Sequence, residues 1–103
     1  MKINPAGFVP ALRTPEGAVL FETPAINLYI AERHGTGLLA PTIDDLDRGL
    51  FLSSLFYIAD ELEPALKRYF YPHRYGVRES DDAGIRGKSQ ETIRHTLGVI
   101  NKR

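Results

Sequence analysis

The sequence contains no cysteine, which excludes a disulfide framework, a thiolate metal ligand and a cysteine nucleophile within these residues. It also has no excess of charge of either sign, because thirteen basic residues balance thirteen acidic ones. This neutrality argues against a nucleic-acid backbone or an anionic membrane as a partner. The longest stretch without a charged residue, residues 49–59, is far shorter than the ~20 residues of a membrane-spanning helix.

The first ten residues, MKINPAGFVP, are interrupted by two prolines and a glycine and do not have the apolar core of a signal peptide. We therefore expect a cytoplasmic protein. Its 103 residues, 43% hydrophobic and 25% charged, are enough for one modest core, as one domain or pieces of two.

Two short apolar segments, residues 9–14 and 18–22, predict a β-hairpin. The intervening Thr14-Pro15-Glu16-Gly17 favours a type I turn, with proline at its second position and glycine at its fourth. The run of residues 18–21 is apolar without alternation, which is typical of a strand covered on both faces. A helix packed on this strand is expected to follow.

That helix is predicted from Thr23 to His34. Thr23 is a good N-cap, Pro24 suits the first helical position, and His34-Gly35 is a typical stop. The spacing of Ile26, Tyr29 and Ile30 predicts an apolar inward face.

The second half predicts long helices. Leucines and aromatic residues recur every three to five positions from Asp44 to about Tyr71, with Thr42 as the expected cap. Pro64 should bend this helix near Asp60. A further helix is expected after Ser80, with an apolar stripe of Ile93, Leu97 and Ile100 and with Gly84 and Gly87 weakening its first half.

This order of elements, together with three stretches of sequence, resembles the glutathione S-transferase family of bacterial type. The stretches are NPAGFVPAL (residues 4–12), LFETPAINLYIAERHG (20–35) and, more loosely, LLAP with ALKRYFYPHRYG. The resemblance implies an α+β chain, with a β-hairpin and helix from a thioredoxin-like domain followed by long helices of an all-α domain. It divides the chain into a thioredoxin-like part (1–36), a linker (37–43) and the start of a helical domain (44–103).

The resemblance also implies a glutathione site. In the family the Val-Pro bond is cis, and the backbone of this valine pairs with the cysteinyl part of glutathione, which points to Val9 and Pro10 here. An acid followed by Ser or Thr holds the γ-glutamyl end, which points to Glu22 and Thr23. Glutathione is then the expected co-substrate, an electrophilic small molecule the second substrate, and a homodimer the expected assembly.

Two departures from the family pattern limit what the resemblance implies. Many relatives carry a lysine that contacts the glycyl carboxylate of glutathione, and this chain has Phe8 there. The catalytic Ser, Tyr or Cys of the family lies upstream of the segment that corresponds to Met1. We therefore expect a fragment without a catalytic residue of its own, lacking the first half of the thioredoxin-like domain and the end of the helical domain.

Other functions are weighed against this one. A non-catalytic transferase-like module for binding or dimerisation is the main alternative, and a small helical protein with an incidental hairpin is a third. The three histidines, His34, His73 and His95, lack metal-ligand spacing, so no metal site is expected. The aromatic and basic residues 69–75 could stack nucleic acid, but zero net charge favours packing with a solvated rim.

Overall fold

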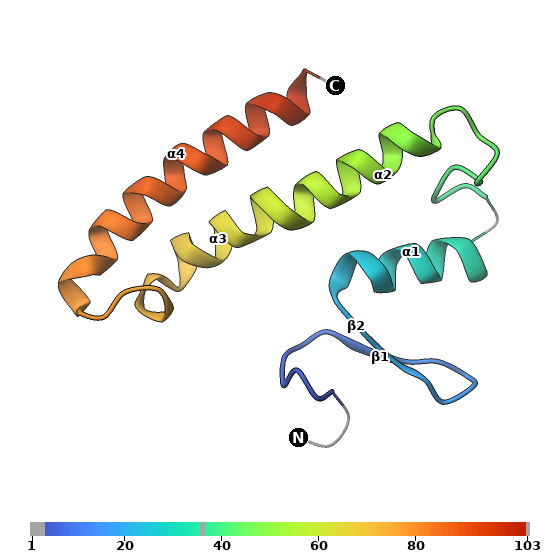
Figure 1. The fold of residues 1–103 in the computed structure, drawn as a ribbon, viewed down its shortest axis with the longest axis horizontal. Coiled ribbons are helices and arrows are strands. Elements are labelled where there is room, and N and C mark those ends of the chain that lie inside the picture. The colour runs from blue at the N-terminus through green and yellow to red at the C-terminus, as the bar shows by residue number, and fades with distance from the viewer. Residues whose placement is uncertain (1–3, 36, 103) are drawn as a thin grey trace. The chain divides into compact units, whose positions relative to one another are not determined.

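The computed structural model describes residues 4–35 and 37–102 and has a mixed α+β fold (Figure 1), which confirms the predicted class. Its elements, in chain order, are β1 (Ala11–Arg13), β2 (Val19–Phe21), α1 (Thr23–Arg33), α2 (Arg48–Tyr57), a π-helical turn (Ile58–Leu62), α3 (Glu63–Phe70), two 3-10 turns (Pro72–Arg74 and Glu79–Asp81) and α4 (Asp82–Asn101). The chain divides into two compact units, Met1–Leu52 and Ser53–Arg103.

The predicted hairpin is present, with strands shorter than expected. β1 and β2 are antiparallel, and Leu12 lies opposite Leu20. In the turn, the Gly17 N–H donates to the Thr14 carbonyl at 2.9 Å, and the Ala18 N–H donates to the Thr14 hydroxyl at 3.1 Å. Gly17 has a φ of 93°, a conformation that glycine adopts without steric cost. The turn therefore follows from its local sequence.

α1 begins one residue earlier than a Thr23 cap would place it. The Glu22 carbonyl accepts the Ile26 N–H at 3.0 Å, so Glu22 is the N-cap residue and Thr23 is already helical. The prediction of Thr23 as N-cap is therefore wrong, and no side chain caps this end. The predicted stop is confirmed, because the N–H groups of His34 and Gly35 both donate to the Ile30 carbonyl.

Burial on this hairpin and helix is narrower than the periodicity predicts. Ile26 and Ala31 are the buried residues of α1, whereas Ile30 is exposed. Val19 and Leu20 are half-buried and Phe21 is exposed, so the expectation of a strand covered on both faces is wrong for Phe21.

The long predicted helix starts at Arg48 instead of Asp44. Before it, the Asp45 N–H donates to the Thr42 carbonyl, and the Asp45 carboxylate accepts the Asp47 N–H at 2.8 Å. Aspartate side chains that bond to the backbone two residues on stabilise turns in place of helix. The prediction of Thr42 as the helix cap is therefore wrong.

A π-helical turn precedes Pro64 in the structure, and the bend expected near Asp60 stays a prediction. A proline ring clashes with the carbonyl four residues earlier, here Asp60. The preceding turn widens, and the Glu63 N–H donates to the Ile58 carbonyl five residues back. After this wider turn, α3 continues as regular helix to Phe70.

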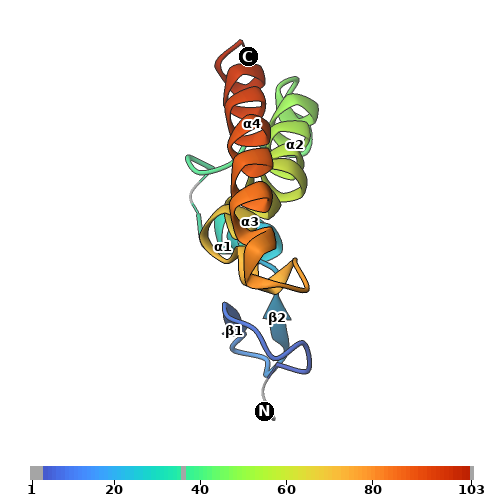
Figure 2. The ribbon, with the colours of Figure 1, turned by 90° about the vertical axis from the view of Figure 1, so that its left-hand side faces the viewer.

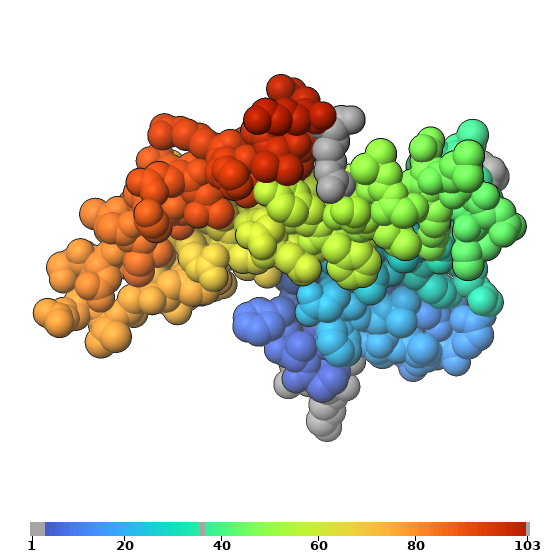
Figure 3. Space-filling model, turned by 45° about the horizontal axis from the view of Figure 1, so that its top comes forward, coloured from blue at the N-terminus to red at the C-terminus, as the bar shows by residue number. Residues whose placement is uncertain are grey.

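In the second unit, α4 packs against α3 and the π-helical turn, and Figures 1, 2 and 3 show α4 running alongside α3. The tightest packing involves small side chains, since Ala65 and Thr96 are 1% exposed and Ser89 is 3% exposed. Leu97, a member of the apolar stripe that the sequence predicts, is 49% exposed.

No helix in the described part of the chain is long and apolar enough to cross a membrane. The cytoplasmic location stays a prediction.

Candidate functional site

The four residues predicted to bind glutathione lie at one end of the hairpin. Val9 and Pro10 precede β1, Glu22 connects β2 to α1, and Thr23 is the first residue of α1. The last pair of the ladder joins Ala11 to Phe21, so both pairs of residues flank the same end of the hairpin.

The Val9–Pro10 peptide bond is cis, as the family resemblance implies. Val9 is 88% exposed. Within residues 4–35 and 37–102, no hydrogen bond to the Val9 backbone is present. Among the described residues, its amide and carbonyl therefore have no partner, as a ligand that pairs like a short strand requires.

Asn4 holds the loop before Val9 and was not identified from the sequence. It is 3% exposed, its carbonyl accepts the Gly7 N–H, and its side chain accepts the Ala6 N–H and donates to the Phe8 carbonyl. An Asn-Pro pair is a turn signal, so this role was accessible to sequence reasoning. Phe8 itself is 73% exposed, and it offers no cation at this position.

Glu22 has a backbone conformation that the sequence did not indicate. Its φ is 73° and its ψ is 114°, and it is the one non-glycine residue with positive φ among those described. Such a conformation costs about 1–3 kcal/mol and is often found at functional sites. The strain is part of the turn that connects β2 to α1, and the Glu22 side chain is exposed there.

The first turn of α1 presents a positive end that no side chain within the described residues caps. The Glu22 side chain makes no capping bond, and the first N–H groups of a helix have no acceptor within it. The N-terminal end of the helix dipole attracts an anion, while the nearby carboxylate attracts a cation. Together these groups suit a zwitterionic ligand end, in which an ammonium and a carboxylate sit on one carbon.

Arg48, outside the predicted site, has a structural role in the first unit. Arg48 donates to the Pro41 carbonyl at 2.9 Å and pairs with Glu32, so it connects α2 with α1 and with the segment between them. Over the described residues, no group of three or more His, Asp or Glu side chains is placed to hold a metal ion.

The aromatic and basic run at residues 69–75 is stacked within its own unit. Arg74 lies 4.4 Å from the centroid of the Tyr71 ring, and Arg86 lies 5.8 Å from that of Tyr69. Arg86 also donates to the Tyr69 carbonyl at 3.2 Å. These contacts support local packing of the run.

Comparison with known proteins bears on the same segments. Residues 1–33 match the family model described as "Glutathione S-transferase, N-terminal domain". The fold matches the beta-class glutathione S-transferase of Sphingomonas chungbukensis with a TM-score of 0.76 and 32% identity, over 97% of this chain and 46% of that one. These matches identify a glutathione S-transferase-family protein over part of the chain.

Two further proteins similar to this glutathione S-transferase-family protein have different names, one a transferase and the other an elongation factor. One is a sphingomonad glutathione S-transferase whose structure is complexed with glutathione, with a TM-score of 0.75, 32% identity and 97% of this chain covered. The other is elongation factor 1-gamma 3 of Oryza sativa subsp. japonica, 34% identical over 73 residues, or 70% of this chain. The chain spans 46% of the solved transferase and 17% of the elongation factor.

The matched segment 1–33 contains all four predicted site residues, Val9, Pro10, Glu22 and Thr23. Glutathione binding within the family is supported by the sphingomonad complex. The assignment of these four residues to glutathione stays a prediction.

Proposed function

We propose that this chain supplies part of the glutathione site of a glutathione S-transferase, which in its complete form conjugates glutathione to electrophilic small molecules. The observation that carries the proposal is the hairpin, whose last pair, Ala11 with Phe21, is flanked by Val9-Pro10 on one strand and by Glu22-Thr23 at the N-terminus of α1 on the other. Membership of the family and the glutathione complex of a relative support the choice of ligand.

Each residue has a distinct role in this proposal. The exposed Val9 backbone pairs with the cysteinyl part of glutathione, and Pro10 completes that loop. The Glu22 carboxylate binds the γ-glutamyl ammonium, and the Thr23 hydroxyl and N–H bind the adjacent carboxylate. A hydrogen bond to a charged group is worth about 1.5–3 kcal/mol, so Glu22 and Thr23 together dominate affinity for this end.

The domain organisation is proposed on the same basis. Residues 1–36 form the glutathione-binding part of a thioredoxin-like domain, residues 37–43 are a linker, and residues 44–103 begin the helical domain. We also propose a homodimer, as the family resemblance implies.

In the complete transferase, a catalytic side chain other than the four site residues lowers the pKa of the glutathione thiol. The thiolate then attacks an electrophilic carbon, forming a carbon–sulfur bond as a leaving group departs with its electron pair. Val9, Pro10, Glu22 and Thr23 take no part in these bond changes. They hold the peptide so that its cysteinyl group has a fixed position.

The experiment is a calorimetric titration of glutathione into the chain and into a Glu22→Gln, Thr23→Val variant. The matched control is Asp44→Asn with Thr42→Val, which makes comparable changes at exposed positions of the same unit. We expect affinity to fall by about tenfold or more in the first variant and to stay unchanged in the control. Equal heats for all three proteins would refute the site.

A second function, a non-catalytic binding or dimerisation module, is favoured by one observation. The similarity to elongation factor 1-gamma 3 extends over 70% of this chain, and that protein's name describes no transferase. The two functions are separated by an assay for conjugation of glutathione to a chloronitrobenzene by the complete protein. Product formation supports the enzyme, whereas glutathione binding without product supports the module.

A further inference from the structure

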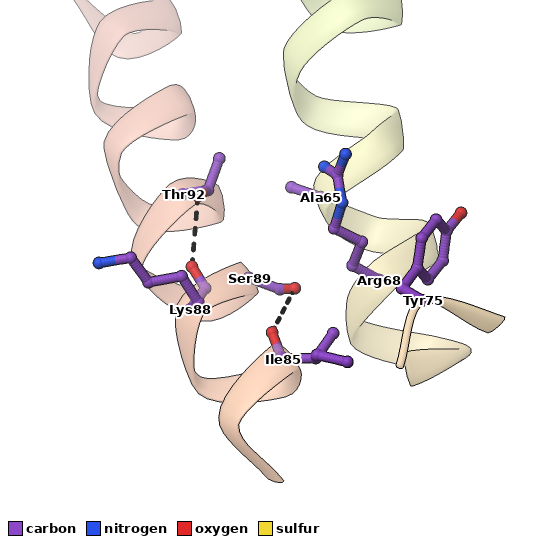
Figure 4. A pocket seen from close by; sticks show the side chains of 7 residues that line it. All are labelled: Ala65, Arg68, Tyr75, Ile85, Lys88, Ser89 and Thr92. Atoms are coloured by element: carbon purple, nitrogen blue, oxygen red, sulfur yellow. Dashed lines mark hydrogen bonds between the residues drawn. The ribbon is translucent and has the colours of Figure 1, made fainter. Parts of the chain in front are cut away.

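The second unit contains a pocket that the glutathione proposal does not use. It has a volume of about 350 Å³ and lies between α3 and α4, with a wall from the connector that precedes α4 (Figure 4). Its lining residues are Ala65, Arg68, Tyr75, Ile85, Lys88, Ser89 and Thr92. Small-molecule pockets have volumes of about 300–1,000 Å³, so this one suits a ligand built around a single ring.

Arg68 provides the one cation of the pocket that has no acidic partner. Its guanidinium lies 5.5 Å from the centroid of the Tyr75 ring, and within residues 4–35 and 37–102 no carboxylate pairs with it. Figure 4 shows the guanidinium on the α3 side, beside Ala65. A guanidinium held against a ring keeps its N–H groups available for a planar anion.

Lys88 is different, although it also lines the pocket. Its ammonium pairs with Glu91 at 2.9 Å, and in Figure 4 the end of its side chain points away from α3. This pairing raises the pKa of Lys88 and lowers that of Glu91, through a hydrogen bond first and charge second. The pocket therefore offers one uncompensated positive charge, which suits a monoanion better than a phosphate dianion.

The remaining walls are apolar or offer hydrogen-bond acceptors. Ala65 and Ile85 contribute methyl groups, and Tyr75 contributes a ring. The Ser89 hydroxyl donates to the Ile85 carbonyl at 2.7 Å, and that of Thr92 donates to the Lys88 carbonyl at 3.2 Å. Because their protons are engaged, these hydroxyl oxygens offer lone pairs. A ligand that carries its own donor is complementary to them.

We propose that this pocket binds a small aromatic monocarboxylate that carries a hydrogen-bond donor on its ring. The carboxylate pairs with Arg68, the ring lies against Tyr75 and the aliphatic side chains, and the donor reaches the oxygen of the half-buried Thr92. All seven lining residues belong to the unit Ser53–Arg103, and the four residues of the proposed glutathione site belong to Met1–Leu52.

The test uses para-hydroxybenzoate as the probe, titrated into the 103-residue chain by calorimetry, with circular dichroism to verify that each variant is folded. We expect saturable binding that weakens about tenfold or more in Arg68→Gln, because a charge-assisted pair is lost. Lys88→Gln should bind as the wild type does. So should Arg94→Gln, which removes an exposed cation of α4 outside the pocket lining.

Two related compounds test the chemistry. Para-hydroxybenzamide, which has no charge, should bind about tenfold more weakly or worse, and benzoate, which lacks the donor, should bind a few-fold more weakly. The proposal is overturned by an Arg68→Gln affinity within about twofold of wild type, by equal binding of the amide, or by no saturable binding. The Glu22→Gln, Thr23→Val variant should retain full affinity for this probe, which separates the two proposals.

Discussion

Glycine-to-alanine substitutions in the second unit should change the free energy of unfolding in opposite directions at different positions. Gly87 and Gly98 lie inside α4, and a Cβ atom built at either position would meet nothing within 4 Å. Glycine in a helix interior costs about 0.8–1.0 kcal/mol relative to alanine. The two positions are roughly 16 Å apart along the helix at 1.5 Å per residue, so their effects should add. The double alanine variant should gain about 2 kcal/mol.

Gly76 is the control, with the same chemical change in the same unit. A Cβ there would lie 2.8 Å from the Asp81 Cβ and 2.9 Å from the Ile85 Cδ1. Asp81 cannot move freely, because its carboxylate accepts the N–H groups of Val77 and Arg78 at 3.1 and 2.9 Å. Forcing an extra methyl group into a packed site costs about 1–3 kcal/mol. Gly76→Ala should therefore destabilise the protein.

The assay is urea unfolding followed by far-ultraviolet circular dichroism, which reports on the helices. With a slope of about 1–3 kcal/mol/M, the gain in Gly87→Ala, Gly98→Ala should raise the unfolding midpoint by about 1 M. Gly76→Ala should lower it. The reasoning is refuted if the double variant is no more stable than wild type, or if all three substitutions shift the midpoint in the same direction.

Three further outcomes follow from the first unit. The Glu16 backbone N–H and the Thr14 hydroxyl lower the pKa of the Glu16 carboxyl, with a smaller effect of Arg33. The carboxylate therefore stabilises the fold above its ordinary pKa of about 4.3, and this stabilisation disappears as pH falls through the lowered pKa. The unfolding free energies of Glu16→Gln and wild type should differ at neutral pH and converge in acid. Arg48→Met should lower the unfolding free energy by about 1–3 kcal/mol, because the Arg48 side chain is 16% exposed and engaged, while the exposed Arg13→Met should change it little in the same urea titration. Glu22→Gly should raise thermal stability, by about 1 kcal/mol, since it relieves a positive φ, and weaken glutathione binding in calorimetry; a loss of stability would contradict the strain argument.

Local sequence determined the elements of this protein. The Thr14–Gly17 turn, the His34-Gly35 stop and the helices on either side of the connector depend on residues within one or two turns of each other. The family resemblance was also carried by short stretches, and residues 1–33 match the family model. Such signals act over a few bonds, so one sequence is enough to detect them.

Errors appeared where two local signals compete. Thr42 and Thr23 were both expected to cap helices, but the Asp45 side chain stabilises a turn after the first and the Glu22 carbonyl starts the helix before the second. Asn4 was missed although its turn chemistry is local.

Tertiary structure decided what depends on residues distant in the chain. The pairing of Arg48 with Glu32, the burial of Ala65, Ser89 and Thr96 between helices, and the pocket beside Arg68 each join segments whose spacing in sequence carries no periodic signal. Turns and helices are selected by neighbours along the backbone. The buried face of a helix and the lining of a pocket depend on packing between side chains that are distant in sequence, and these side chains come into contact only in the folded chain.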